Sequence, residues 1–291
     1  MYAITGITGQ VGGEMARRLL AAGAPVRAVV RDGAKGAPWA SQGCEVVRAT
    51  MENAAALTTA LAGADGVFIL PPSEFDPEPG YPEARTVIEA VRTALVAAKP
   101  KRVVCLSTIG ADAPHDNLLT QRTLMENALG GLDIPVTFLR PAWFMENAVW
   151  DVPDARDEGV LRSFLQPPEK AFPMVATKDV GSIAADLIQQ HWSGTRIVEL
   201  EGPARVSPND LAMAFSDALG HKVKVESVPR SSWEALFVSQ GAKRPLPRIR
   251  MLDGFNEGWI DFRNVDRLTL RGTTPLSEVI DALVARASVT P

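Results

Sequence analysis

The first thirty residues contain the feature that most restricts what this chain can fold into. A short apolar run at 2–4 leads into G-I-T-G-Q-V-G at 6–12, and apolar side chains then recur at helical spacing through 11–20. Gly23 ends that helix, and the apolar run at 26–30 is typical of a second buried strand. The pattern therefore predicts a strand, a glycine-rich turn, a helix and a parallel strand.

A glycine turn in this setting predicts a phosphate site. It leaves backbone N–H groups and the positive end of the helix dipole facing the same space, which suits the pyrophosphate of a dinucleotide. The alternative is a purely structural bend between strand and helix. If the turn binds a cofactor, the contacting residues are Gly6, Thr8, Gly9, Gln10, Val11 and Gly12.

Arg31, directly after the second strand, decides which dinucleotide is expected. Ligands of open α/β sheets lie beyond the carboxyl ends of the strands, so this residue would reach the adenosine ribose. A guanidinium favours a ribose 2′-phosphate, which makes NADP(H) the preferred cofactor and leaves NAD(H) open. Asp32 could instead bind the ribose hydroxyls or pair with Arg31, and Arg31 could be a solvated loop charge.

Composition narrows the class of protein. The chain has 291 residues, 46% of them hydrophobic and 22% charged, and a net charge of −4, which argues against a general nucleic-acid surface. No apolar run reaches membrane-spanning length, and the fold starts at residue two, so we expect no membrane segment, no signal peptide and a cytoplasmic protein. Cys44 and Cys105 lie in apolar runs, which predicts buried thiols, and no Cys/His spacing predicts a metal site.

Strand-like and helix-like segments alternate through the first 140 residues, and this order predicts a Rossmann-type, doubly wound parallel sheet of the α/β class. The tail after residue 207 has no short crossover back to such a sheet, so we expect a smaller C-terminal α+β lobe. The further expected strands are 43–48, 66–70, 102–106, 134–139 and 195–200. The division is 1–141 plus 174–202 for the NAD(P)-binding part, and 142–173 plus 203–291 for the substrate-side lobe.

Several segments resemble the NmrA-like branch of the atypical short-chain dehydrogenases. They are T-G-I-T-G-Q-V-G at 5–12, V-R-A-V-V-R at 26–31, A-L-A-G-A-D-G-V-F-I-L at 60–70, K-R-V-V-C-L-S-T-I-G at 101–110 and P-V-T-F-L-R-P-A-W-F-M-E-N at 135–147.

The resemblance implies NAD(P) binding, in a family that ranges from reductases of quinones or enzyme-bound iminium ions to cofactor-sensing regulators. It implies cofactor contacts from the glycine turn and Arg31. This sequence departs from the family at Ala49-Thr50, where members often have Gly-Asp, so the adenine-side aspartate contact is not expected. The remaining implied contacts are Leu70, Pro71, Ser107, Thr108 and Pro141.

Most short-chain reductases protonate the product with a tyrosine whose pKa is lowered by a lysine four residues on. Here the only tyrosines are Tyr2 and Tyr81, no lysine lies between 101 and 170, and Gln121 stands where related proteins place the lysine. Hydride transfer without that pair suits a quinone-like or other conjugated acceptor, or an iminium, better than a ketone.

Other side chains are candidates for the chemistry. Ser107 and His115 are the weak catalytic candidates, with a strand-end cap and a solvated loop residue as the respective alternatives. Trp143, Phe144 and Asn147 are expected to line the acceptor pocket, with packing of the lobe as the alternative. Asp112, Asp116 and Glu146 could bind a cationic substrate.

Two functions follow from these observations. The first is an NADPH-dependent reductase of a small-molecule acceptor. The second is a non-catalytic protein that senses NAD(P) and acts through a regulatory protein partner. The absence of the tyrosine–lysine pair is consistent with either function. The sequence does not decide whether the protein forms a homodimer.

Overall fold

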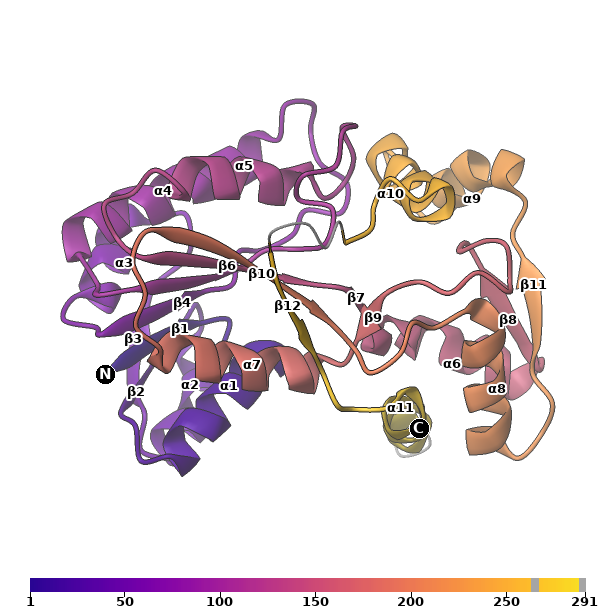
Figure 1. The fold of residues 1–291 in the computed structure, drawn as a ribbon, viewed down its shortest axis with the longest axis horizontal. Helices are drawn as coiled ribbons and strands as arrows, with labels where there is room; N and C mark the ends of the chain where they lie inside the picture. Colours follow the sequence, from indigo (N-terminus) through magenta and orange to yellow (C-terminus); the bar gives the residue numbers. More distant parts are fainter. Residues whose placement is uncertain (263–266, 288–291) are drawn as a thin grey trace.

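The computed structural model describes residues 1–262 and 267–287, and its centre is an eight-stranded sheet in which every pairing is parallel. The expected Rossmann-type α/β fold is confirmed (Figure 1). From one edge to the other the strands are β12 (Leu268–Arg271), β10 (Thr195–Glu201), β6 (Val136–Pro141), β5 (Val103–Leu106), β4 (Gly66–Ile69), β1 (Tyr2–Thr5), β2 (Val26–Val30) and β3 (Glu45–Arg48).

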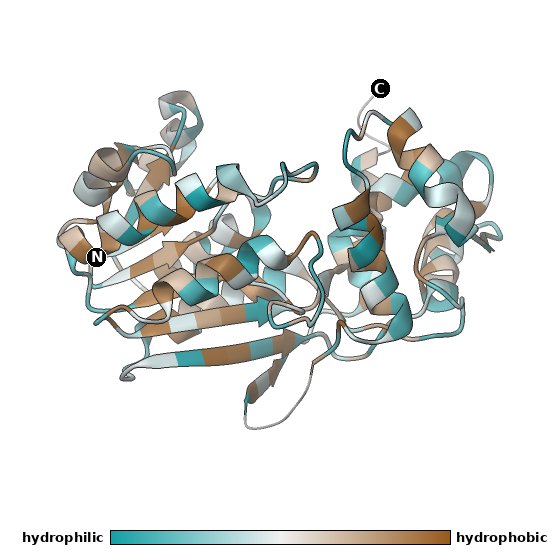
Figure 2. Cartoon of the chain, turned by 90° about the horizontal axis from the view of Figure 1, so that it is seen from above, coloured by the Kyte–Doolittle hydropathy of each residue, from teal (hydrophilic) through white to brown (hydrophobic). Residues whose placement is uncertain are grey.

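Helices cover both faces of this sheet, as doubly wound folds require. Figure 2 shows brown, apolar strands at the centre and helices with teal faces turned outward. One face is covered by α3 (Ala54–Leu61), α4 (Pro82–Ala98) and α5 (Thr120–Leu129), and the other by α1 (Gln10–Ala21), α2 (Gly33–Ala40) and α7 (Thr177–Gln189).

The strands divide their side chains between two cores. In β5, Val103 and Cys105 belong to the cluster beneath α4 and α5, whereas Val104 and Leu106 belong to the cluster on the opposite face. This alternation follows from the two-residue period of a strand. Cys44 and Cys105 are both buried, as predicted, and burial raises the pKa of the Cys105 thiol to about 12.

A lobe lies beyond the carboxyl ends of the strands (Figure 1). It contains two small parallel pairs, β7 with β9 and β8 with β11, and several helices. Its elements are β7 (Trp143–Phe144), η1 (Met145–Asp151), α6 (Val152–Asp157), β8 (Val160–Ser163), β9 (Met174–Val175), α8 (Pro208–Leu219), β11 (Lys224–Ser227), η2 (Arg230–Ser232), α9 (Trp233–Ser239), α10 (Leu246–Glu257) and α11 (Leu276–Ala287).

One expectation about the tail is wrong. Residues after 207 do return to the sheet, because β12 pairs in parallel with β10, placing Val198 opposite Leu268. The lobe itself forms the long crossover between these two strands. As an edge strand of four residues with an exposed Leu268 and Arg271, β12 lacks the continuous apolar run by which buried parallel strands are recognised.

Candidate functional site

The turn between β1 and α1 is built on close backbone contact. Gly6 has a φ of +67°, in the left-handed region that favours glycine. A Cβ at Gly12 would overlap the carbonyl oxygen of Gly6 and lie 2.7 Å from its carbonyl carbon. Glycine at these two positions therefore lets the first turn of α1 lie directly against the end of β1.

The first turn of α1 has no side-chain cap. Gly9 occupies the N-cap position, and no acidic side chain lies in this turn. The first N–H groups of a helix have no intrahelical partner, and the helix dipole places positive potential beside them. Thr8, Gly9 and Gln10 are exposed, so the turn is accessible to an anionic ligand.

Thr5 joins this turn to the neighbouring strand. Its hydroxyl donates to the carbonyl of Phe68 over 3.1 Å and accepts from the N–H of Leu70 over 2.8 Å. A Cβ on Gly6 would lie 3.0 Å from the side chain of Leu70. The structure therefore brings Leu70, and Pro71 after it, beside the glycine turn.

The side chain of Gln10 is engaged with the start of α7. Oγ1 of Thr177 lies within hydrogen-bond distance of Gln10 Oε1, at 2.7 Å, and of Glu146 Oε1, at 2.6 Å. The N–H of Thr177 also donates to the Glu146 carboxylate. Glu146, a candidate partner for a cationic substrate, is thus already used in holding α7 near the glycine turn.

Arg31 is exposed directly after β2, whereas Asp32 has a local role. Asp32 is the N-cap of α2 and accepts from the N–H of Ala34 over 3.0 Å. Among the residues described, no ion pair joins Asp32 to Arg31. Arg31 is therefore exposed at the carboxyl edge of the sheet and is not paired with Asp32.

Ser107 follows β5 and is bound to a buried ion pair. Its hydroxyl donates to Glu126 Oε1 on α5 over 2.5 Å. Arg140 on β6 donates to both oxygens of the same carboxylate, over 2.8 and 2.5 Å. The Arg140 side chain is 4% exposed and that of Glu126 9%, so the pair lies inside the protein.

The ion pair extends through the loop after β5. Arg140 Nη1 lies 3.1 Å from Asp112 Oδ2, and Arg267 contacts Asp112 at 2.7 Å and Glu199 at 2.9 Å. Burial alone would raise the pKa of Asp112, but Arg267 and Arg140 outweigh burial and lower it. Sequence reasoning missed this network. The available signal was Arg140 itself, because an arginine in a buried strand requires an acidic partner.

Gln121, which stands where related proteins place the lysine, and its neighbour Arg122 both bond to the loop that follows β4. Gln121 accepts from the N–H of Glu74 over 3.1 Å and donates to its carbonyl over 2.8 Å. Arg122 donates to the Pro71 carbonyl over 2.9 Å and to the Ser73 hydroxyl over 2.6 Å. Both side chains of α5 therefore fasten the segment that follows β4.

Tyr81 is similarly occupied. Its hydroxyl donates to the carbonyl of Asn117 over 3.0 Å, and the side chain is buried. Burial raises the pKa of this phenol, which makes it a poorer acid than an exposed tyrosine.

The aromatic candidates for the acceptor pocket lie where the sheet meets the lobe. Trp143 and Phe144 form β7 and are half-buried, and Trp143 packs edge-to-face on Phe255 of α10 with ring centroids 5.2 Å apart. Asn147, in η1, is exposed. The two rings thus contribute to lobe packing as well as to the surface near the end of β6.

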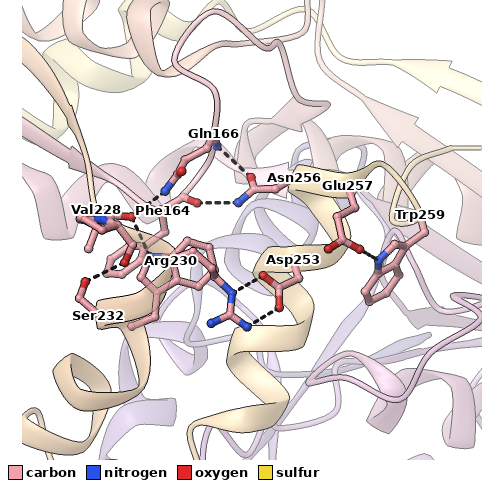
Figure 3. Close-up of polar contacts among 11 residues, drawn as sticks. Phe164, Gln166, Val228, Arg230, Ser232, Asp253, Asn256, Glu257 and Trp259 are labelled. Atoms are coloured by element: carbon pink, nitrogen blue, oxygen red, sulfur yellow. Dashed lines mark hydrogen bonds and ion pairs between the residues drawn. The ribbon is translucent and has the colours of Figure 1, made fainter.

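His115 lies against the lobe. Its ring packs edge-to-face on Trp259, with centroids 5.1 Å apart. Figure 3 shows Trp259 donating to Glu257 and Arg230 paired with Asp253 on the same side of α10. An open pocket of about 320 Å³ is lined by His115, Asp116, Arg250, Asp253, Glu257 and Trp259.

Two features are absent from residues 1–262 and 267–287. No group of three or more His, Cys, Asp or Glu side chains there could hold a metal ion. In the same ranges no helix has both the length and the apolar character needed to cross a bilayer.

Comparison with known proteins agrees with the resemblance seen in the sequence. Residues 2–257 match the NmrA-like family. A (4-alkanoyl-5-oxo-2,5-dihydrofuran-3-yl)methyl phosphate reductase of Streptomyces griseus is 30% identical, covering 78% of this chain and 77% of the relative. Quinone oxidoreductase 2 of Escherichia coli is 28% identical, covering 97% and 98% of the two chains.

A solved structure is similar over the same length. The crystal structure of an NADPH-dependent quinone oxidoreductase from Escherichia coli, complexed with NADPH, has a TM-score of 0.80 and 26% identity, covering 97% of this chain and 99% of the other. With the family match spanning seven of the eight strands of the sheet and most of the lobe, the chain belongs to the NmrA-like family.

Proposed function

We propose that this protein is an NADPH-dependent reductase that moves hydride to a quinone-like or other conjugated acceptor, or to an iminium. The uncapped first turn of α1 is the observation that carries this assignment, because its N–H groups suit a pyrophosphate and have no capping side chain of their own. The relative that this chain matches over 97% of its length is a quinone oxidoreductase, which supports the same reading.

The residues present fit a phosphorylated dinucleotide. The turn from Gly6 to Gly12 would hold the pyrophosphate, and Arg31 would bind the ribose 2′-phosphate with charge-assisted hydrogen bonds. Bound in this way, the cofactor supplies the hydride. The residues that would line its nicotinamide end are Leu70, Pro71, Ser107, Thr108 and Pro141.

The choice of acceptor follows from the missing proton donor. A ketone that takes up hydride becomes a basic alkoxide, whereas a quinone becomes a hydroquinone anion that takes its proton from water, and an iminium becomes a neutral amine. Tyr81 is hydrogen-bonded and buried, and Gln121 holds the Glu74 backbone. Binding and orientation would then supply most of the rate enhancement.

We place the acceptor between the carboxyl edge of the sheet and the lobe. Trp143, Phe144 and Asn147 would line its pocket, since they directly follow β6 on that side. In this division residues 1–141 and 174–202 bind the cofactor, and residues 142–173 and 203–291 form the acceptor side, except that β12 returns to the sheet.

A panel of acceptors tests the proposal. Purified protein is mixed with NADPH and with quinones, azo compounds or simple ketones, and NADPH absorbance is followed. Quinones should be reduced and simple ketones should not. Turnover of ketones with quinones left untouched would contradict the proposed chemistry.

The same assay separates a reductase from a sensor. If no acceptor is reduced, and NADPH and NADP⁺ bind tightly but with clearly different dissociation constants, the protein would be a cofactor-sensing regulator.

A further inference from the structure

The direction of one hydrogen bond at the end of β5 determines what Ser107 can offer a ligand. The serine is 6% exposed, and its N–H donates to the Leu139 carbonyl within the sheet. Its hydroxyl lies 2.5 Å from Glu126 Oε1. A hydroxyl has one hydrogen to donate and two lone pairs with which to accept.

Glu126 fixes the position of that hydrogen. The carboxylate receives two hydrogen bonds from Arg140, at 2.8 and 2.5 Å, and the guanidinium also faces Asp112 at 3.1 Å. A carboxylate paired in this way with a guanidinium is ionised and only accepts. The hydrogen of Ser107 therefore points to Glu126, and the lone pairs of Oγ remain for another donor.

The geometry points to Ser107 as a hydrogen-bond acceptor for the carboxamide –NH₂ of the nicotinamide, with Glu126 as the residue that orients its hydroxyl. This inference rests on the proposed function. From the glycine turn at β1, β5 lies two strands away, about 10 Å, on the side opposite to β2 and Arg31. An extended dinucleotide with its adenosine near Arg31 brings its nicotinamide to this end.

The consequence for the chemistry is that Ser107 orients the cofactor and does not protonate the product. Its only hydrogen is held by Glu126. The carboxamide is the part of the nicotinamide that carries N–H donors, and fixing it sets which face of the ring is turned to the acceptor.

A cofactor analogue tests this contact by binding alone. Reduced 3-acetylpyridine adenine dinucleotide phosphate has a methyl group in place of the carboxamide –NH₂. Dissociation constants for NADPH and for this analogue are measured by calorimetry with the wild type and with Ser107→Ala. The wild type should bind the analogue about three- to tenfold more weakly than NADPH, the range of one hydrogen bond. Ser107→Ala should bind both about equally.

Two further variants complete the experiment. Ser239→Ala removes another hydroxyl, one that donates to the Leu236 carbonyl in α9, and should keep the full wild-type discrimination. Glu126→Gln replaces an acceptor with a group that can donate to Ser107, and should reduce the discrimination. Should Glu126→Gln fail to fold, the Ser107→Ala comparison still decides.

The outcomes are distinct. Discrimination by Ser107→Ala equal to that of the wild type would overturn the role of Ser107. Equal binding of both cofactors by the wild type would overturn the contact itself. Failure of the wild type to bind NADPH at all would instead overturn the proposed function, and this inference with it.

Discussion

Several side chains at the carboxyl edge of the sheet make hydrogen bonds within the protein. Gln121 and Arg122, in the region where a catalytic pair would lie, bond to the backbone after β4. Ser107 bonds to a buried carboxylate. Under the proposed function, the groups that would bind the cofactor are the N–H donors of the glycine turn, the Arg31 guanidinium and the lone pairs of Ser107.

Gly12 is the position in the turn with the least room. A Cβ there would overlap the Gly6 carbonyl oxygen, so Gly12→Ala should lower the free energy of unfolding by about 1–3 kcal/mol and weaken NADPH binding. Gly131→Ala is the matched control, because a Cβ added at Gly131 would have no other atom within 4 Å. Chemical denaturation and NADPH titration measure both effects, and wild-type stability of Gly12→Ala would contradict the packing described.

Arg31 should set the preference between the two cofactors. Arg31→Ala should weaken NADPH binding by about tenfold to a hundredfold, the range for a charge-assisted hydrogen bond, and change NADH binding by less than about threefold. Arg92→Ala, which removes an exposed arginine of α4, is the control. Tighter binding of NADH than NADPH by the wild type, or an unchanged NADPH affinity of the variant, would end the assignment.

At the junction of η1 and α6, the carboxyl group of Asp151 lies in surroundings that disfavour its charged form. Asp151 ends η1 as the N-cap of α6, with no side-chain cap hydrogen bond. Burial raises its pKa to about 7, and the nearby charge of Asp154 adds to the rise. The folded protein therefore keeps a proton that the unfolded chain releases near pH 4.

This difference makes stability depend on pH. Because the folded state binds more protons between about pH 4 and 7, the free energy of unfolding should fall as the pH rises through this window. Asp151→Asn should raise the free energy of unfolding by about 1–3 kcal/mol at pH 8 and leave it nearly unchanged at pH 4. Thermal unfolding across this range, with exposed Asp157→Asn as control, tests the claim. Parallel wild-type and Asp151→Asn profiles would contradict it.

The elements also show which parts of a fold a sequence can predict. β4 and β5 are uninterrupted apolar runs, all of whose residues are buried, and such runs identify parallel strands without any tertiary information. β12 has exposed ends and a half-buried centre. Its place beside β10 depends on where the lobe returns the chain, which no local pattern of residues specifies.

The candidate site likewise has one part that the sequence predicts and another that it does not. The glycine turn was predictable because its three glycines lie within seven residues, between a strand and a helix. The ion network of Glu126, Arg140, Asp112 and Arg267 was not, since its members come from separate parts of the chain and meet only in the folded protein.

At the scale of the whole molecule, the loop after β4 joins the sheet to the lobe. Asp76 accepts from the N–H groups of Lys243 and Arg244, over 2.9 and 2.6 Å, between α9 and α10. Arg244 also pairs with Glu78. The loop that borders the expected cofactor site is thus bound to the same part of the lobe that carries α10.

Breaking this connection should loosen the loop without unfolding the protein. Asp76→Ala should accelerate amide hydrogen exchange at 73–80 and 241–246 while changing the free energy of unfolding by no more than about 1 kcal/mol. Hydrogen exchange followed by mass spectrometry measures this, with Glu89→Ala, at an exposed residue of α4, as control. Unchanged exchange in both segments would show that other contacts hold the loop.

The central claim is that hydride reaches an acceptor here without a tyrosine as proton donor. Since the chain has 2 tyrosines, the double variant Tyr2→Phe/Tyr81→Phe removes every such donor. The most direct measurement is its rate of quinone-dependent NADPH oxidation beside that of the wild type. We predict rates within about threefold of each other, whereas a loss of about a hundredfold or more, as expected when a general acid is removed, would contradict the account.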